Sequence, residues 1–232
     1  TLPKHVEQWI DNGLGGVVLF RRNIETLEQL ITLNGSILGR KQPLMLGVDE
    51  EGGRVRRLRG MTSDLPPMAE LGATQDPAIA YRCGALLGRE LASLGFSINF
   101  APILDVHTNP NNPVIGDRAF ATTPEAVVRM ALPFAKGLQD MGVAACGKHF
   151  PGHGDTDTDS HLALPILDHN EHRLASVELA PFRAAAATDI ASMMTAHVVI
   201  KAYNEDHPST LDGRALSPVS YTHLRAHETE AY

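Results

Sequence analysis

The sequence has few cysteines and no strongly basic or long apolar stretch. Cys83 and Cys146 are its only cysteines, and their separation gives no metal-ligand spacing, so we expect two buried thiols rather than a disulfide. With 20 Lys and Arg against 27 Asp and Glu, and no basic run, a nucleic-acid or anionic-membrane partner is not expected. No apolar run approaches the ~20 residues that a membrane helix needs.

What the sequence does have is an alternation of apolar runs and helical patterns. The apolar runs are continuous, as in strands buried on both faces, and predict strands at 15–20, 44–48, 97–106, 143–147 and 191–200. Between them, capping residues and Gly or Pro boundaries predict helices at 26–38, 77–94, 124–141 and 171–187, and Pro181 should kink or divide the last. This order predicts a parallel sheet, either doubly wound or a barrel.

Polar clusters at the ends of the predicted strands favour the barrel. They begin at Arg21, Asp49, Asp105, Lys148 and His197, and a (β/α)8 barrel builds its site from the C-terminal ends of successive strands. A doubly wound fold would gather them at one switch point, and no G-x-G-x-x-G is present. We therefore predict a (β/α)8 TIM-type barrel, incomplete with about five of eight strands. The predicted domain is 1–217, followed at 218–232 by a tail that does not continue the pattern and is expected to be disordered or foreign.

The segment KHFPGHGDTDTDSH, at 148–161, could hold a metal, carry acid–base chemistry or be a solvated loop. A calcium loop starting at Asp155 fails, because Ser160 and Ile166 stand where Gly and Glu are required. A zinc pair of His149 and His153 would need a helix, which the intervening Pro and Gly residues disfavour. Asp159 stands two residues before His161 and could orient its imidazole for proton transfer. The spacing alone leaves acid–base chemistry and a solvated loop equally favoured, and Asp155 and Asp157 are expected to be solvated.

Two further segments carry candidate binding residues. In GVDEEGGRVRRLRG, Asp49 ends a strand before a Gly-Gly turn, and such exposed carboxylates commonly bind sugar hydroxyls. Most of the arginines at 54, 56, 57 and 59 are expected to form a solvated basic face. In NPVIGDRAF, Arg118 could reach inward or pair with Asp117 at the surface, and the sequence leaves both open.

Together these segments resemble the bacterial β-N-acetylhexosaminidases of glycoside hydrolase family 3. The motifs DEEGGRVRR, NFAPILDV, IGDRAF, KHFPGHGDTDTDSH and MTAHVVI occur in the family's order, and the likeness covers nearly all of residues 1–217. The resemblance implies a barrel enzyme that needs no cofactor and releases terminal β-linked N-acetylglucosamine with retention, without the usual carboxylate pair. It implies His161 as general acid/base supported by Asp159. It also implies sugar binding by five further residues: Asp49, Arg57, Arg118, Lys148 and His149.

One position of the family pattern has no counterpart. The family's nucleophile is an aspartate in a segment like G-F-x-G-x-x-x-S-D, and nothing after Leu216 matches this segment. Asp212 is not a substitute, because it lies in the preceding loop rather than at a strand end. The expectation is therefore a glycosidase fragment that is itself inactive. Alternatives are a sugar-binding pseudoenzyme, a metal-dependent hydrolase using His149, His153 and His161, or a phosphorylase. The expected substrate is a peptidoglycan fragment in the cytoplasm, with a chitin oligosaccharide as the alternative.

Overall fold

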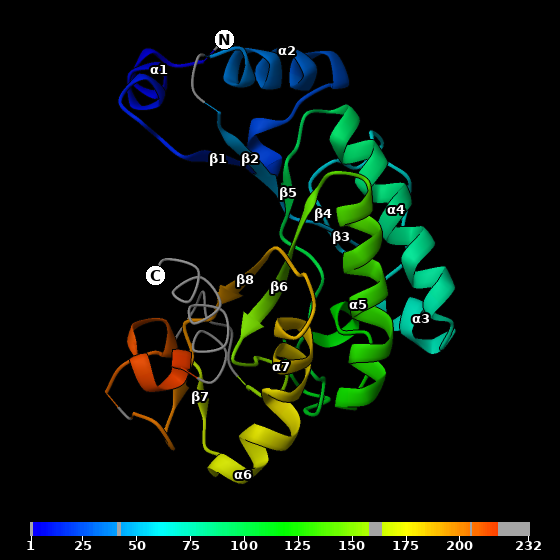
Figure 1. The fold of residues 1–232 in the computed structure, drawn as a ribbon, viewed down its shortest axis with the longest axis vertical. Helices are drawn as coiled ribbons and strands as arrows, with labels where there is room; N and C mark the ends of the chain where they lie inside the picture. Colours follow the sequence, from blue (N-terminus) through cyan, green and yellow to red (C-terminus); the bar gives the residue numbers. More distant parts are fainter. Residues whose placement is uncertain (1, 41–42, 158–163, 205, 218–232) are drawn as a thin grey trace, which may run out of the picture.

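The main sheet contains five parallel strands in the order in which they occur along the chain. The computed structural model describes residues 2–40, 43–157, 164–204 and 206–217; the predicted tail at 218–232 lies outside them. The strands are β1 (Gly16–Leu19), β2 (Met45–Val48), β5 (Ile98–Asn99), β6 (Ala144–Phe150) and β8 (Ser192–Thr195) (Figure 1). A doubly wound sheet reverses its order at a switch point, and this sheet does not. The described strands therefore form part of the wall of a barrel, as predicted, and number five of the eight that closure requires.

Two predicted strands are shorter in the structure than the apolar runs indicated. Within 97–106 only β5 pairs in the ladder; Pro102 has no N–H to donate, and Ile103 makes one isolated bridge with Lys148. The run 191–200 is divided, because β9 (Val199–Ile200) leaves the main sheet and pairs with β7 (Ile166–Leu167). A hairpin of β3 (Glu50–Gly52) and β4 (Val55–Arg56) was not expected, and it follows β2 directly.

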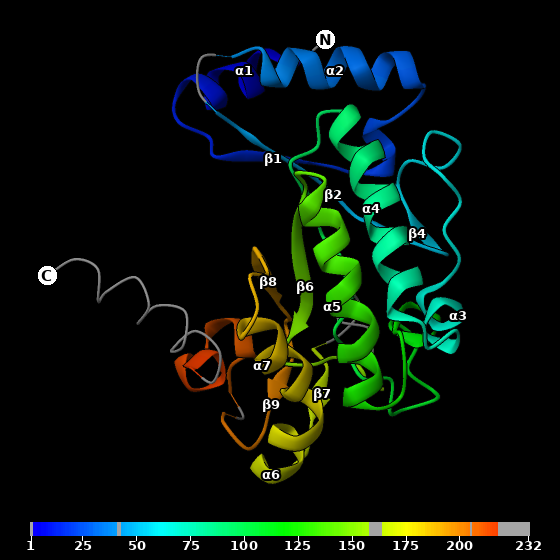
Figure 2. The same ribbon diagram turned by 45° about the vertical axis from the view of Figure 1, so that its right-hand side comes forward.

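Helices α4 (Pro77–Ser93) and α5 (Pro124–Asp140) lie side by side against one side of the sheet in both views (Figures 1 and 2). The predicted starts are confirmed: Asp76 accepts a hydrogen bond from the N–H of Ala78, and Pro124 opens α5. Glycine permits their close contact. A Cβ added to Gly84 would lie 2.1 Å from the carbonyl oxygen of Phe134.

The predicted helix at 171–187 is divided at its middle. Its parts are α6 (Glu171–Arg173), the π-helical turn η3 (Leu174–Glu178) and α7 (Ala180–Ala186), and Pro181 stands in the first turn of α7, where a missing N–H costs little. The other helices are α1 (Lys4–Asp11), α2 (Leu27–Leu38) and α3 (Met68–Ala73), with 3-10 turns η1 (Arg21–Asn23), η2 (Gly116–Arg118) and η4 (Ser209–Leu211). Within the described ranges, no helix has the length and apolar character needed to cross a membrane.

Buried apolar side chains of the strands and surrounding helices form the core. Leu46 and Val48 of β2 and Leu87 and Phe134 of the helices are fully buried in it. Cys146 is buried as expected, Cys83 is half-buried, and both thiols are free. The core thus supports β2, β5 and β6, whose C-terminal ends lead into the polar cluster described next.

Candidate active site

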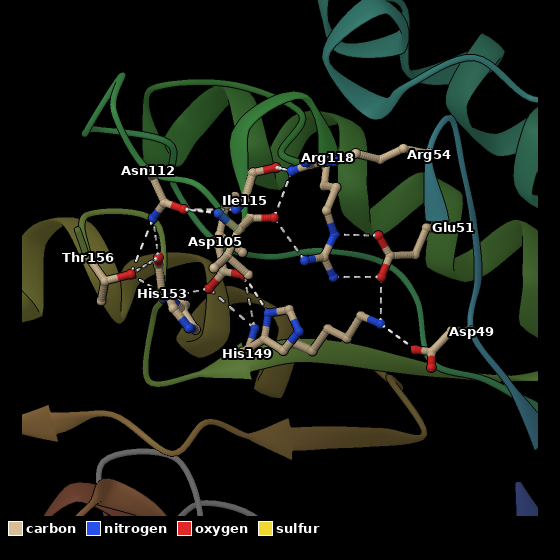
Figure 3. Close-up of polar contacts among 12 residues, drawn as sticks. Asp49, Glu51, Arg54, Asp105, Asn112, Ile115, Arg118, His149, His153 and Thr156 are labelled. Carbon is tan, nitrogen blue, oxygen red and sulfur yellow. Dashed lines mark hydrogen bonds and ion pairs between the residues drawn. The ribbon is translucent and has the colours of Figure 1, made fainter. Parts of the chain in front are cut away.

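Lys148 is the buried centre of this cluster. It lies on β6 and is 2% exposed, and its Nζ lies 2.7 Å from Oδ1 of Asp49 and 2.6 Å from Oε1 of Glu51 (Figure 3). A buried ammonium group is tolerated only where opposite charges and hydrogen bonds replace water. The two carboxylates, which follow β2, provide that replacement and hold the ammonium group at the end of the sheet.

Glu51 joins Lys148 to Arg118. The guanidinium group of Arg118, in η2, binds Glu51 through two parallel hydrogen bonds of 2.9 Å (Figure 3). Burial acts to raise the pKa of Glu51, but the charge of Lys148 and the bonds and charge of Arg118 outweigh it and lower this pKa to about 2. Glu51 is therefore ionised at neutral pH. Arg118 points inward, while Asp117 pairs with Arg54, which resolves the alternative that the sequence left open.

Asp49 and Arg57 form the more open side of the cluster. The guanidinium NH2 of Arg57 lies 3.8 Å from Oδ2 of Asp49, and their side chains are 30% and 18% exposed. The Nε of Arg57 is buried without a hydrogen-bond partner among the described residues. These two side chains therefore retain hydrogen-bonding capacity that a ligand could use.

The expected solvated basic face is wrong for Arg56. Its side chain is almost buried and its Nε lies 3.3 Å from Oε1 of Glu50. The carboxylate of Glu50 also accepts hydrogen bonds from the backbone N–H groups of Arg57 and Leu58. Arg56 and Glu50 therefore hold the β3–β4 hairpin together and so fix the backbone that carries Arg57.

His149 is oriented by Asp105, a fully buried carboxylate that follows β5. Nδ1 of His149 lies 2.8 Å from Oδ2 of Asp105 (Figure 3). The Oδ1 of Asp105 accepts hydrogen bonds from the backbone N–H groups of His149 and His153. Burial lowers the pKa of His149 despite the opposing effect of Asp105. Burial acts to raise the pKa of Asp105, but its interactions with His149 and His153 lower it. A neutral His149 donates through Nδ1 and leaves Nε2 as an acceptor.

His153, in the loop after β6, is buried. Its Nδ1 lies 2.5 Å from Oγ1 of Thr156, while Asn112 donates a hydrogen bond to its backbone carbonyl (Figure 3). The two histidine rings are 6.0 Å apart and sit on the end of β6 and the loop after it, not on one helix. In the part of the chain that the structure describes, no three His, Cys, Asp or Glu side chains are arranged as a metal site.

The structure thus brings together all five predicted sugar-binding residues, from four separate parts of the chain. The predicted acid/base His161 and its partner Asp159 lie outside the described residues. Asp155, expected to be solvated, is instead bonded to Thr108 and His169. Glu51 and Asp105 belong to the polar clusters predicted at the strand ends, but no individual role in the site was predicted for them. Their only signal in the sequence was a position at the end of a predicted strand, because the partners that they hold, two cations for Glu51 and an imidazole for Asp105, are distant along the chain.

Comparison with known protein families identifies the family to which the chain belongs. Residues 3–223 match the family described as Glycosyl hydrolase family 3 N terminal domain. The chain belongs to glycoside hydrolase family 3. Two curated relatives are each named Beta-hexosaminidase: one from Neisseria meningitidis serogroup B is 42% identical over 83% of this chain, and one from Alkalilimnicola ehrlichii is 43% identical over 86%. The alignments cover 55% and 59% of those relatives, so the chain spans little more than half their length.

Solved structures of the family show the same fold. A glycoside hydrolase family 3 β-N-acetylglucosaminidase from Paenibacillus sp. superposes with a TM-score of 0.81 and 45% identity, over 85% of this chain and 39% of that one. NagZ from Neisseria gonorrhoeae in complex with N-trifluoroacetyl-D-glucosamine superposes with a TM-score of 0.83 and 40% identity, over 90% and 63%. The parallel sheet described above is therefore part of the family's TIM-barrel domain.

Proposed function

We propose that the protein is a retaining β-N-acetylhexosaminidase that releases terminal β-linked N-acetylglucosamine. The observation that carries the proposal is the convergence of Asp49, Arg57, Arg118, Lys148 and His149 on one end of the barrel sheet. The names of the relatives, and the glucosamine derivative bound by the Neisseria gonorrhoeae NagZ, support the same substrate class.

In this proposal the described cluster binds the sugar. Asp49 accepts hydrogen bonds from two neighbouring hydroxyls, since its carboxylate is partly exposed and its orientation is held by Lys148. Arg57 donates hydrogen bonds to the sugar through guanidinium N–H groups that its contact with Asp49 leaves without a partner. His149 accepts through Nε2, because Asp105 occupies Nδ1. Preorganised polar groups of this kind bind a ligand without having to be reoriented.

The reaction is proposed to proceed in two steps. His161, oriented by Asp159, donates a proton to the glycosidic oxygen while a carboxylate attacks the anomeric carbon and the aglycone leaves. His161 then takes a proton from water, whose oxygen displaces the carboxylate from the anomeric carbon. No described residue is assigned as that carboxylate. Peptidoglycan fragments in the cytoplasm are the proposed substrate and location.

Chromogenic glycosides test the activity. The protein expressed from its complete gene should hydrolyse 4-nitrophenyl β-N-acetylglucosaminide, and hydrolyse the matching β-glucoside far more slowly. A natural N-acetylglucosamine-containing muropeptide should be a better substrate than chitobiose. Absence of hydrolysis, together with measurable binding of N-acetylglucosamine, would favour the sugar-binding pseudoenzyme.

A further inference from the structure

The imidazole of His149 has one occupied and one open ring nitrogen. Its Nδ1 lies 2.8 Å from Oδ2 of Asp105, while Nε2 makes no hydrogen bond within the described part of the chain. The side chain of His149 is 17% exposed, whereas that of Asp105 is completely buried. Asp105 therefore occupies the inner nitrogen of the ring, and the nitrogen left for a ligand is Nε2.

The ionisation of the two side chains determines which ring nitrogen carries the proton. Burial acts to raise the pKa of Asp105, but its interactions with His149 and His153 lower it, so this carboxylate is ionised at neutral pH and can only accept hydrogen bonds. Burial lowers the pKa of His149, and the charges of Lys148 and Arg118 lower it further (Figure 3). The ring therefore carries a single proton, which the carboxylate holds on Nδ1.

We propose that Asp105 is a positioning residue that fixes this tautomer, so that His149 selects a sugar hydroxyl able to donate a hydrogen bond. The inference rests on the proposed function, in which His149 contacts the sugar. A site built to accept a hydrogen bond rejects an analogue that lacks the donor, because the acceptor is then left unpaired. Fluorine has nearly the size of a hydroxyl group but cannot donate. Asp105 itself does not touch the sugar; it acts through His149.

Asp105→Asn should reverse the hydrogen-bonding role of Nε2 while keeping the shape of the side chain. The Oδ1 of Asp105 accepts the backbone N–H of His153 at 2.7 Å and that of His149 at 3.2 Å. In the variant, the amide oxygen must take this place, because an amide NH2 group cannot accept from an N–H group. The NH2 group then faces Nδ1 of His149 and donates to it, which moves the ring proton to Nε2.

Two measurements on the protein expressed from its complete gene test the proposal. Nitrogen NMR identifies the protonated ring nitrogen of His149, which should be Nδ1 in the wild type and Nε2 in Asp105→Asn. Calorimetry then compares N-acetylglucosamine with its analogues in which fluorine replaces the hydroxyl at C3, C4 or C6. At one of these positions fluorine should weaken binding about 10-fold in the wild type and less than about 3-fold in Asp105→Asn.

Two further variants complete the test. His149→Ala identifies the position concerned, because the loss caused by fluorine should disappear there when the acceptor is removed. Asp168→Asn makes the same change from acid to amide in an exposed ion pair with Lys201, and should keep the wild-type response to all three analogues. If Asp105→Asn does not fold, the tautomer of the wild type and the comparison with His149→Ala decide.

The outcomes separate this inference from the proposed function. A proton on Nε2 in the wild type, or an unchanged tautomer in Asp105→Asn, would overturn the positioning role. A reversed tautomer that keeps the wild-type response to fluorine would show that the tautomer does not select the hydroxyl. If His149→Ala leaves every fluorine effect in place while the wild type hydrolyses the glycoside, this inference alone is wrong. If the wild type does not bind N-acetylglucosamine, the proposed function fails and this inference fails with it.

Discussion

Replacing Glu51 with Gln should strongly destabilise the fold, because Glu51 is the buried anion between Lys148 and Arg118. Its pKa is about 2 rather than the ordinary 4.5. Each pKa unit corresponds to about 1.4 kcal/mol, so this lowering means that ionised Glu51 stabilises the fold by about 3 kcal/mol more than protonated Glu51 does. Removing one partner of a buried ion pair costs a similar amount, about 3–5 kcal/mol. Urea unfolding of the wild type and Glu51→Gln at pH 7 measures the difference.

The same variant predicts a pH dependence. A carboxyl group whose pKa is lowered in the folded state contributes its full stabilisation above its unfolded pKa and loses it as the pH falls through the folded pKa. The difference between wild type and Glu51→Gln should therefore be constant above about pH 4.5 and shrink toward pH 2. The control Asp168→Asn removes an exposed ion pair and should change stability by less than about 0.5 kcal/mol. A loss below about 1 kcal/mol in Glu51→Gln, or a difference that does not change with pH, would refute this reasoning.

Two other substitutions test the site and its support. Lys148→Met should weaken N-acetylglucosamine binding by about 10-fold or more, because it removes the cation that orients Asp49. Calorimetry measures the affinity, and an unchanged affinity would show that the contact between Lys148 and Asp49 is not needed for binding. Gly154→Ala should lower the free energy of unfolding by about 1–3 kcal/mol, because its Cβ would collide with the carbonyl oxygen of Val106. The control Gly35→Ala on α2, where nothing lies within 4 Å of the added Cβ, should leave the stability unchanged or raise it. Equal thermal unfolding temperatures of the two variants would contradict the close contact.

The elements that could be predicted from the sequence are those with local signals. Continuous apolar runs located the five strands of the main sheet, and capping residues such as Asp76 marked where helices begin. The shortened β5 and the divided run at 191–200 could not be read in this way, because apolar character persists where ladder pairing stops. Pro102 was the one local sign of the first of these boundaries.

The sequence predicted five residues that lie together in the structure, but not how they are connected. The motifs identified Lys148 and Asp49, yet their ion pair joins residues 99 positions apart, and local spacing carries no information about such a contact. The roles of Glu51 and Asp105 were not predicted, for the same reason. Each is buried because it holds a distant cation or imidazole, and burial of a carboxylate is a consequence of the fold rather than of its neighbours in sequence.

The measurement that tests the central claim most directly is the stereochemistry of hydrolysis. Proton NMR of 4-nitrophenyl β-N-acetylglucosaminide, mixed with the protein expressed from its complete gene, identifies the anomer of N-acetylglucosamine formed first. A retaining β-N-acetylhexosaminidase should release the β-anomer, which then equilibrates to the α-anomer by mutarotation. First formation of the α-anomer, or no release of the sugar, would contradict the proposed function.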